Sequence, residues 1–575
     1  MVLRLRLVAD FTVDTLAAML RNDGAEPTLE VTIAPFGRVV PELMALASRD
    51  AADAPATDPV LVWTRPEGII GIYHQALEGQ PFEIPALLEE VDRFADQLLA
   101  VAARGSTVLM AAWTRPAHHR GLGLLDWQPG MGLRYALTAM NLRLAQRLAE
   151  HPGCHLLDTE RWVSTAGPRS LNIKRWYLSK VWYAGEVFQI ATAEIKAALA
   201  TLQGCGRKLL ILDLDNTLWG GVVGDDGMEG LVLGGHDPMG EAFVDFQRTI
   251  KALSRRGILL AVVSKNEETV ALHAMDNHPE MVLRREDLAA WRINWQDKAA
   301  NIRDLVAELN LGLQSCVFLD DSPFERARVR ETLPEVLVPE LPESPLLLVP
   351  MLEALTCFDP RSLTPEDRQR QQMYQAERHR RVAQGQSGDL HAWLHGLGMT
   401  VTALDLNAVD LARAAQLLNK TNQMNLITRR LAEAELLAWC REDQRHFWTF
   451  RIGDRFGDAG LSALVSVEIP GKGESVAHLV DFVVSCRVFE RGVEESLLAF
   501  SVAWIRERYG HVVRLEARFL PTAKNLPCLR FFRERSGFEE QGPGNGNGAQ
   551  AVFVWQLERP YPLPSHITLQ WAGTP

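Results

Sequence analysis

The sequence predicts a multidomain α/β protein, and three observations lead to this prediction. Residues 1–205 alternate short apolar runs with amphipathic stretches of helical period. The apolar run LLIL at residues 209–212 then opens a second unit of the same kind. From residue 390 onward the predicted order becomes a strand, two helices and three strands, followed by alternating helices and strands. Two units with parallel sheets and a final α+β unit around an antiparallel sheet are therefore expected.

Each element of the first unit follows from a local pattern. Its apolar runs are short enough to be buried strands, and longer amphipathic stretches separate them. We predict strands in VLRLRLVA, LEVTIAP, PVLVWT, STVLMAAW and CHLLD, and helices over residues 12–22, 84–103 and 131–150. Parallel strands joined by crossing helices form a doubly wound sheet that is covered on both faces.

The boundaries between units follow changes in composition. The first unit is assigned to residues 1–205 and the second to residues 206–360. Residues 361–388 are charged and helix-prone, which is typical of a connector. The last unit is assigned to residues 389–575 and contains a flexible loop, GPGNGNGAQ, at residues 542–550.

Composition excludes several classes of protein. A length of 575 residues suggests about three to five domains. The formal net charge of −12 argues against a general nucleic-acid binder, which would carry a basic face. No apolar run predicts a signal peptide or a membrane span. The seven cysteines form no CxxC pair, so we expect neither a disulfide framework nor a zinc cluster, and we predict a cytoplasmic protein with reduced thiols.

A pair of carboxylates follows the first strand of the second unit. In LLILDLDNTLW, four apolar residues precede Asp213 and Asp215. Residues two apart on an extended chain point to the same side, and ligand sites of parallel sheets lie at such strand ends. Two adjacent carboxylates repel each other unless a cation lies between them. Mg²⁺ is the natural cation, since it takes oxygen ligands and bridges to phosphate.

Three further pieces follow in order along the chain. Ser264 ends the strand LLAVVS and offers a hydroxyl to a phosphate oxygen. Lys298 begins a predicted helix, where its ammonium can balance phosphate charge. Asp320 and Asp321 follow the strand CVFL as a second carboxylate pair. The set DxDxT, Ser, Lys and Asp-Asp resembles the motifs of the haloacid-dehalogenase (HAD) superfamily of phosphoryl-transfer enzymes.

The HAD resemblance implies a role for each of these residues. Asp213 is expected to attack phosphorus and form an aspartyl-phosphate. Asp215 is expected to protonate the leaving oxygen and then to activate water. The resemblance also implies that phosphate is bound by Thr217, Ser264 and Lys298, and that the metal is bound by Asp213, Asp215, Asp320 and Asp321.

Longer segments resemble one family more closely, the FkbH-like family. They are DLDNTLWGGVVGDDG, QLLNKTNQMNLITRR, DRFGDAGL and SCRVFERGVEESLL, within residues 213–538. The resemblance implies a HAD domain fused to a C-terminal acetyltransferase-like (GNAT) fold and a role in polyketide pathways. Such an enzyme takes 1,3-bisphosphoglycerate, releases its phosphates and loads a glyceryl unit onto the phosphopantetheine thiol of an acyl carrier protein. The implied cofactors are Mg²⁺ and the phosphopantetheine that the carrier protein supplies.

Cys486 is the candidate that carries the acyl group. It follows the strand HLVDFVVS, where a GNAT fold opens a V-shaped cleft, and precedes a helix whose N-terminus favours a thiolate. The alternative is a small buried cysteine in a core strand. His478 on the same strand is a candidate base for the thiol, and its alternative is a structural or surface histidine.

The last unit departs from a conventional coenzyme A site at two positions. Glu490 replaces the first glycine of the pyrophosphate loop, and Phe532 lies where the late tyrosine acid would fall. Both departures disfavour an acetyl-coenzyme A N-acetyltransferase. Arg487 and Arg491 are candidates to bind the arm's phosphate, and the alternative is a pair of surface charges. The polar run between two helices supplies candidates to bind the glyceryl hydroxyls, namely Asn419, Thr421, Asn422 and Gln423.

The first unit resembles an SGNH-hydrolase-like fold more loosely. Asp10 and Thr12 follow its first strand, where such a hydrolase has a GDS-type serine, and we find no D-x-x-H near its end. We therefore predict a degenerate domain that serves packing or partner docking. The aromatic and basic run IKRWYLSKVWY, residues 173–183, either contacts an acidic carrier protein or packs this domain on the next.

Four functions compete on this sequence. The first is a phosphatase and glyceryltransferase that acts on a carrier protein. The second is a HAD phosphatase with a non-catalytic C-terminal domain, and the third is a coenzyme A-dependent acetyltransferase. The fourth is a non-catalytic scaffold, which the complete set of phosphoryl-transfer residues disfavours. The expected partners of the first are the carrier protein and a phosphorylated three-carbon donor, with no nucleic acid and no membrane.

Overall fold

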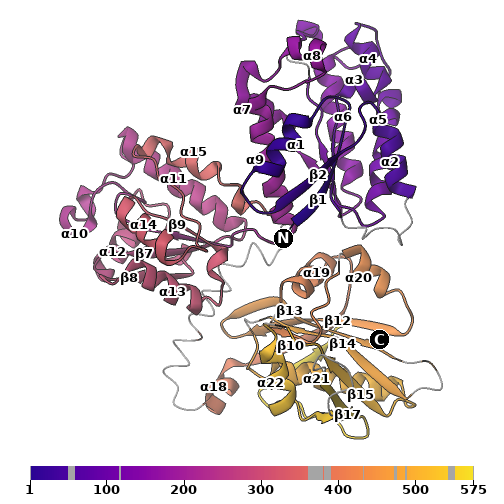
Figure 1. Cartoon of the computed structure of the whole chain (residues 1–575). Helices are drawn as coiled ribbons and strands as arrows, with labels where there is room; N and C mark the ends of the chain where they lie inside the picture. Colours follow the sequence, from indigo (N-terminus) through magenta and orange to yellow (C-terminus); the bar gives the residue numbers. More distant parts are fainter. Residues whose placement is uncertain are drawn as a thin grey trace. The chain divides into compact units, whose positions relative to one another are not determined.

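The computed structural model describes residues 2–48, 58–115, 118–360, 380, 390–421, 423–431, 433–469, 471, 475–485, 488–522, 524–541 and 551–573. Its contacts divide the chain into two units, Met1–Gln203 and Gly204–Pro575. The second unit contains two separate sheets (Figure 1). Apart from Arg380, the predicted connector at residues 361–388 lies outside the described residues. Within the described ranges, no helix combines the length and apolar character that a membrane span requires.

The N-terminal sheet has the five predicted strands, and all of them are parallel. Their order is β2-β1-β3-β4-β5, with β1 (Val2–Ala9) beside both β2 (Thr28–Ile33) and β3 (Val60–Trp63). β4 (Val108–Ala111) and β5 (Cys154–Leu157) complete the sheet. The strand order reverses between β1 and β3, and such a switch point opens a crevice at the carboxyl ends of the strands.

Helices cover both faces of this sheet, as predicted. One face packs on α1 (Asp14–Asn22), α7 (Thr159–Ala166) and α9 (Gly185–Leu202). The other face packs on α2 (Val39–Ser48), α4 (Gly71–Leu77), α5 (Ile84–Ala102) and α6 (Leu133–Leu148). The three predicted helices correspond to α1, α5 and α6 and differ from them only at their ends, whereas α2, α4, α7 and α9 were not predicted. Two short helices, α3 (Pro66–Ile69) and α8 (Ile173–Ser179), lie between these elements.

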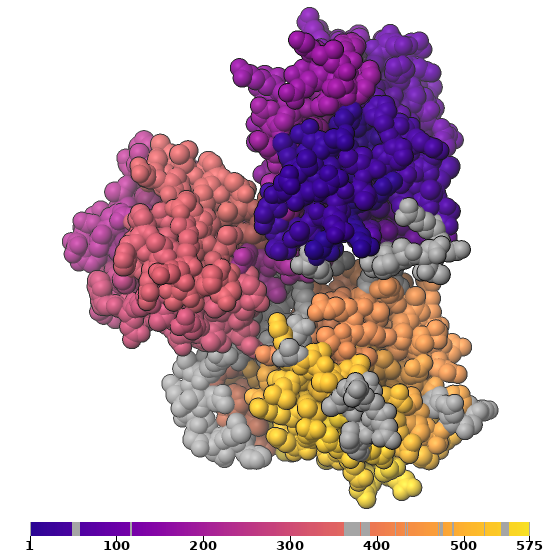
Figure 2. Space-filling model, viewed as in Figure 1, coloured from indigo at the N-terminus to yellow at the C-terminus, as the bar shows by residue number. Residues whose placement is uncertain are grey.

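The central sheet is also parallel, in the order β8-β7-β6-β9. Its strands are β6 (Leu209–Leu212), β7 (Leu259–Ser264), β8 (Ala290–Ile293) and β9 (Cys316–Leu319). One face packs on α11 (Pro238–Arg255), α12 (Glu268–Asn277) and α15 (Leu348–Glu353), and the other on α13 (Lys298–Glu308) and α14 (Pro323–Thr332). The carboxyl ends of β6, β7 and β9 therefore meet at one edge. Figure 2 shows one face of this part of the chain, drawn in magenta to salmon.

The C-terminal sheet is mixed, whereas an antiparallel sheet was predicted. Two of its strand pairs, β10 with β18 and β14 with β15, are parallel. The order is β16-β17-β15-β14-β13-β12-β10-β18. The strands are β10 (Met399–Asp405), β12 (Arg445–Asp454), β13 (Gly457–Glu468), β14 (Val476–Val484), β15 (Arg514–Phe519), β16 (Glu539–Gln541), β17 (Ala551–Gln556) and β18 (Ile567–Trp571).

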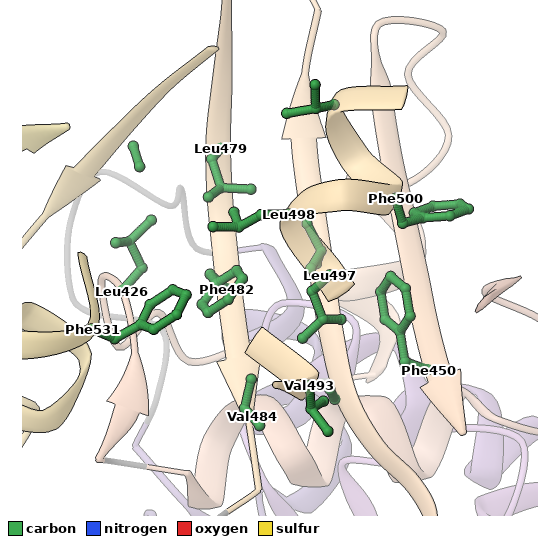
Figure 3. Packing of buried hydrophobic residues seen from close by; sticks show 14 of the residues in the cluster. Leu426, Phe450, Leu479, Phe482, Val484, Val493, Leu497, Leu498, Phe500 and Phe531 are labelled. Atoms are coloured by element: carbon green, nitrogen blue, oxygen red, sulfur yellow. The ribbon is translucent and has the colours of Figure 1, made fainter. Parts of the chain in front are cut away.

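Helices cover both faces of the C-terminal sheet as well. α19 (Leu411–Lys420) and α20 (Glu433–Trp439) pack on one face. α18 (Leu390–Leu397), α21 (Val493–Arg508) and α22 (Leu526–Glu534) pack on the other. Figure 3 shows the apolar contacts of this second face, where Phe482 and Val484 of β14 lie near Val493 and Leu497 of α21. The packing places the end of β14 beside the start of α21.

β14 and β15 separate partway along their length. They pair only over Val476–Leu479 of β14. Beyond that point the short strand β11 (Met424–Asn425) pairs with β14 instead. The next residue, Leu426, donates its N–H to the Phe482 carbonyl at 3.3 Å and accepts from the Leu520 N–H at 3.1 Å. The predicted opening between two strands is therefore present, and residues 424–426 lie in it.

Candidate active site

Asp213 lies at the carboxyl end of β6 and is almost fully buried. Its N–H donates to the Leu319 carbonyl at 3.0 Å, which ties it to the neighbouring strand β9. Its Oδ1 lies 3.0 Å from Lys298 Nζ and accepts no hydrogen bond among the described residues. Burial raises the pKa of Asp213 to about 6, although the positive charge of Lys298 acts to lower it. A buried carboxylate oxygen of this kind needs a further positive partner.

Lys298 begins α13 and connects the two carboxylate pairs. The helix start is set by Asp297, whose side chain accepts a hydrogen bond from Ala300 N. Lys298 Nζ lies 2.6 Å from Asp320 Oδ2, in addition to its contact with Asp213. Burial lowers the pKa of Lys298, but the two carboxylates together raise it above its ordinary value. Lys298 therefore stays protonated beside Asp213, the predicted nucleophile.

Three carboxylates of this edge are arranged as metal ligands. Asp213, Asp320 and Asp321 each offer one oxygen, and these oxygens lie within 4.8 Å of one another. The three carboxylates carry three negative charges and Lys298 carries one positive charge, which gives a formal total of −2. Burial also raises the pKa of both Asp320 and Asp321. A hard divalent cation with oxygen ligands, such as Mg²⁺, would give Asp213 Oδ1 a second positive partner beside Lys298 and balance this charge, so the residues fit the predicted metal.

The Asp215 carboxylate does not belong to this group, and the role of Asp215 as a metal ligand stays a prediction. Its Oδ1 accepts from Trp219 Nε1 at 2.9 Å and from Val223 N at 3.0 Å. The prediction assumed an extended chain, but β6 ends at Leu212, and Asn216 has a left-handed φ of 51°. The alternation of side chains along a strand therefore does not apply here.

Asn266 is a buried site residue that the sequence analysis missed. Its Nδ2 donates to Asp215 Oδ2 at 2.8 Å and to Ser264 Oγ at 3.2 Å. It therefore orients the expected acid/base carboxylate and the expected phosphate-binding hydroxyl together. The available signal was its position, two residues beyond Ser264 at the end of a strand that points to the site.

Thr217 and Ser264 lie at the same edge as the carboxylates. The hydroxyl of Thr217 accepts a hydrogen bond from Asp321 N at 3.2 Å, so Thr217 holds the loop that carries the second carboxylate pair. Ser264 ends β7 and is buried next to Asp213, and its hydrogen bond lowers the pKa of that carboxyl. The structure thus brings all the predicted residues of the phosphoryl-transfer site to one edge of the sheet.

The predicted acyl-transfer residues are only partly described. Cys486, Arg487 and Asn422 lie outside the described residues. On either side of the first two, Ser485 N donates to the Ser462 carbonyl and Val488 N donates to the Ser485 carbonyl. The Arg491 carbonyl accepts from His566 Nε2 at 2.8 Å. The chain between β14 and α21 is therefore held at both ends.

His478 is wrongly predicted as a base for the thiol. It lies near the start of β14, and its Nδ1 is 3.8 Å from Glu516 Oε2 of β15. Seven residues of extended chain separate it from Ser485, which corresponds to roughly 23 Å. A direct proton transfer between His478 and a group beside Ser485 is excluded at that distance.

The polar run after α19 has a structural role at its first position. Asn419 Nδ2 donates to the Leu431 carbonyl at 2.8 Å, and Leu431 N donates back to Asn419 Oδ1 at 3.1 Å. Asn419 thus closes the loop, and its predicted role toward the glyceryl hydroxyls stays a prediction. The Thr421 carbonyl accepts a hydrogen bond from Asn425 Nδ2. The roles of Thr421 and Gln423 toward the glyceryl hydroxyls stay predictions.

Two buried asparagines, which the sequence analysis did not single out, hold residues 424–426 in place. Asn525 Nδ2 donates to the carbonyls of Asn425 at 3.1 Å and Leu520 at 2.8 Å. Asn425 in turn accepts the Thr428 N–H at its Oδ1. Both asparagines are fully buried. Residues 424–426 are therefore built into the opening between β14 and β15.

The two departures from a coenzyme A site have clear local consequences. Glu490 adopts a left-handed φ of 65°, a conformation that favours glycine, and its N–H donates to Glu494 Oε1 at 2.6 Å. Phe532 is fully buried and lies edge-on to Phe482. Neither position offers the group that a coenzyme A-dependent acetyltransferase uses there.

Asp10 and Thr12 of the N-terminal unit are engaged in structural contacts. Asp10 is buried, accepts from Arg65 N at 2.9 Å and lies 3.2 Å from Arg65 Nε. Burial raises the pKa of Asp10 to about 6. Thr12 donates its hydroxyl to the Ser179 carbonyl at 2.8 Å. Asp10 and Thr12 therefore stabilise the fold at this strand end, where the sequence has no GDS-type serine.

Known structures support the phosphatase assignment. The chain is similar to the N-terminal part of a Bacteroides fragilis protein that contains a phosphatase domain and was crystallised with Mg. The identity is 29%, the TM-score is 0.56, and the match covers 63% of this chain and 95% of that one. The similarity and the carboxylate geometry together support a phosphatase domain of the HAD type.

Other similarities are more limited. An aminoglycoside acetyltransferase in complex with coenzyme A is 16% identical and covers 27% of this chain, with 94% of its own chain matched and a TM-score of 0.22. A Vibrio cholerae spermidine N-acetyltransferase is 14% identical and covers 28%, with 97% of its own chain matched and the same TM-score. Similarities of this extent identify neither a fold nor an activity for the C-terminal sheet. No protein-family model matches the sequence, and neither does any curated protein.

Proposed function

We propose that this protein is a bifunctional phosphatase and glyceryltransferase of polyketide biosynthesis. It takes 1,3-bisphosphoglycerate, removes phosphate and transfers the glyceryl unit through a thioester on Cys486. The acceptor is the phosphopantetheine thiol of an acyl carrier protein. The observation that carries the proposal is the group formed by Asp213, Asp320, Asp321 and Lys298 at the carboxyl edge of the central sheet.

The phosphatase half follows from the contacts of this group. Asp213 attacks phosphorus to form an aspartyl-phosphate, and Lys298 neutralises part of the charge on the phosphate oxygens. Asp215 protonates the leaving oxygen and then takes a proton from the attacking water. Trp219 and Asn266 hold the Asp215 carboxylate for this role. Mg²⁺ would be held by Asp213, Asp320 and Asp321, and it supplies a positive charge to the phosphoryl oxygens.

The acyl-transfer half rests on the FkbH-like segments and on the placement of their neighbours. An acyl phosphate is a reactive donor, and a thiolate is an apt acceptor. β14 ends at Val484 and the next helix, α21, starts at Val493, so the segment that contains Cys486 in the sequence runs from a strand end to a helix N-terminus, which favours an anion. Since residues 424–426 lie along β14, the arm of the carrier approaches the end of this strand beside Ser485.

Two alternatives make different predictions. A phosphatase with a non-catalytic C-terminal domain would release phosphate but never gain an acyl mass. An acetyltransferase would consume acetyl-coenzyme A, and the conformation of Glu490 and the burial of Phe532 disfavour it. Measurement of the intact protein mass after mixing with 1,3-bisphosphoglycerate separates the proposed function from both alternatives, and consumption of acetyl-coenzyme A separates the two alternatives from each other.

Two variants test the proposal on the full-length protein. Cys486→Ala is expected to gain no acyl mass and to load no carrier protein, yet to hydrolyse p-nitrophenyl phosphate at the wild-type rate. Asp213→Asn is expected to lose phosphate release by more than ~10³-fold, about 4 kcal/mol of barrier. Cys205→Ala, at an exposed cysteine, is the matched control and should retain both activities. Normal carrier loading by Cys486→Ala would exclude the thioester on this residue.

A further inference from the structure

We propose that the outer face of α8 is the docking surface for the carrier protein. This inference rests on the proposed function, because it names the surface that receives the acceptor. The surface consists of Lys174, Arg175, Tyr177 and Leu178 on α8 (Ile173–Ser179). It belongs to the N-terminal unit, at the edge of the sheet where α3 also lies (Figure 1).

α8 is held rigidly although none of its residues is fully buried. At its start, the Asn172 side chain accepts a hydrogen bond from Arg175 N. At its end, Thr12 donates its N–H to the Lys180 carbonyl and its hydroxyl to the Ser179 carbonyl, both at 2.8 Å. Contacts at both ends fix a short helix that would not be stable alone.

One inward side chain completes this attachment. The Trp176 ring lies 4.1 Å from the Arg65 guanidinium carbon and 5.0 Å from the Trp182 ring. Arg65 is itself paired with Asp10 at the end of β1. The helix is therefore joined to the carboxyl edge of the N-terminal sheet through Trp176. A helix fixed in this way loses little conformational entropy when a partner binds.

The face opposite Trp176 is directed to solvent. At 3.6 residues per turn, Lys174 and Leu178 lie about half a turn away from Trp176 and four residues from each other. Tyr177 is 73% exposed and Leu178 is 75% exposed. Large apolar side chains exposed side by side on a rigid helix are typical of a binding surface.

The segment that contains this face is basic, although the whole chain is acidic. Residues 162–185 contain four basic residues and no Asp or Glu, whereas the chain carries a formal net charge of −12. The four are Arg169, Lys174, Arg175 and Lys180, and all are exposed. Exposed basic side chains on the same short segment as exposed apolar ones are complementary to an acidic helix with an apolar stripe.

An acidic protein fits this surface better than a nucleic acid or a membrane. Nucleic-acid binders extend a basic face over many phosphates, and here the basic residues are confined to one short segment. A membrane-surface helix buries a long apolar face, whereas α8 has only seven residues. An acidic carrier protein presents both carboxylates and an apolar contact, and its arm carries the acceptor thiol.

The test is carrier loading by the full-length protein with the charge of α8 reversed. For the double variant Lys174→Glu, Arg175→Glu, we expect the KM for a phosphopantetheinylated acyl carrier protein to rise at least ~10-fold, because rim charges set the association rate. Free pantetheine as acceptor should react at the wild-type rate, since it lacks the protein surface. The matched control is Arg104→Glu, an exposed arginine beyond the other end of the sheet, which should leave both acceptors unaffected.

The apolar part of the surface is tested separately by Tyr177→Ala, Leu178→Ala, which should raise the same KM with less dependence on salt. An unchanged KM for the carrier in both double variants would overturn the docking surface while the proposed function stands. If the wild type loads neither pantetheine nor the carrier, the proposed function itself fails. Charge-sensitive binding to phosphatidylglycerol vesicles or to a single-stranded oligonucleotide, without binding to the carrier protein, would also overturn the proposal.

Discussion

Asn266 Nδ2 lies 2.8 Å from Asp215 Oδ2 and donates a hydrogen bond to it. The same amide donates to Ser264 Oγ at 3.2 Å. One buried side chain therefore links the carboxylate assigned to proton transfer with the hydroxyl assigned to phosphate binding. Trp219 and Val223 complete the set of donors around Asp215. Proton transfer depends on the direction of this carboxylate, so Asn266 is expected to act through its position.

We predict that Asn266→Ala lowers kcat for phosphomonoester hydrolysis by about 10- to 100-fold, since supporting contacts of this kind typically contribute that much. The apparent affinity for Mg²⁺ should stay unchanged, because Asn266 contacts none of the three clustered carboxylates. The control is Asn301→Ala, which removes another buried amide of this domain, paired with Asn294. An equal loss of activity in both variants would indicate a general effect on folding.

Substitution of Asp215 and substitution of a clustered carboxylate should have different effects on Mg²⁺ binding. We expect Asp321→Asn to raise the Mg²⁺ concentration required for half-maximal activity by roughly tenfold or more. Asp215→Asn should abolish turnover yet bind Mg²⁺ as wild type does, measured by calorimetry on the protein alone. EDTA should remove activity from the wild type, and added Mg²⁺ should restore it. Equal weakening of Mg²⁺ binding by both variants would return Asp215 to the metal site.

Glu494 should make stability depend on pH. It is buried at the start of α21, and one of its oxygens has no hydrogen-bond partner among the described residues. Burial raises its pKa from 4.5 to about 7. The folded protein therefore keeps a proton that the unfolded chain releases above pH 4.5, and this stabilisation is lost as the pH rises to 7. The shift corresponds to about 3 kcal/mol.

The measurement is the Tm of the wild type and of Glu494→Gln at pH 5 and pH 8. The wild type should lose more stability than the variant between these pH values, because glutamine does not titrate. Glu507→Gln, at an exposed position of the same helix, should follow the wild type. Parallel curves for the wild type and Glu494→Gln would show that Glu494 has an ordinary pKa.

Asn525 should control the opening between β14 and β15. Asn525→Ala leaves the buried Asn425 carbonyl and the partly buried Leu520 carbonyl without this donor, at a cost of about 1–3 kcal/mol. We expect a lower Tm and slower carrier loading, with hydrolysis of p-nitrophenyl phosphate unchanged. Asn407→Ala, at an exposed asparagine, is the control. Unchanged loading in a destabilised Asn525→Ala would show that the position of residues 424–426 does not matter for acyl transfer.

Much of the phosphoryl-transfer site could be predicted because its signals are local. A run of four apolar residues followed by Asp213 indicates both a buried strand and the edge at which it ends. The same reasoning placed Ser264 after β7 and the Asp320–Asp321 pair after β9. Lys298 begins the predicted helix, since Asp297 is a typical N-cap residue. Parallel strands bring such ends together without any knowledge of side-chain contacts.

The local sequence did not determine the direction in which individual side chains point. Asp215 turns away from the metal ligands because β6 ends at Leu212, and the turn that follows depends on contacts with Trp219 and Val223. Likewise, His478 lies near the start of β14, which ends at Val484, and its side chain is directed to Glu516 of the neighbouring strand β15.

The apolar and polar pattern alone specifies the strands, the order of the helices and the edge that carries the carboxylates, since burial of apolar residues dictates each of them. Pairings between distant segments depend on the complete fold. Asn525 holds Asn425 across 100 residues of chain, and Asn266 reaches Asp215 across 51. A hydrogen bond needs its two atoms within about 3 Å. That precision arises only when the strand register and the packing of the surrounding side chains are both in place.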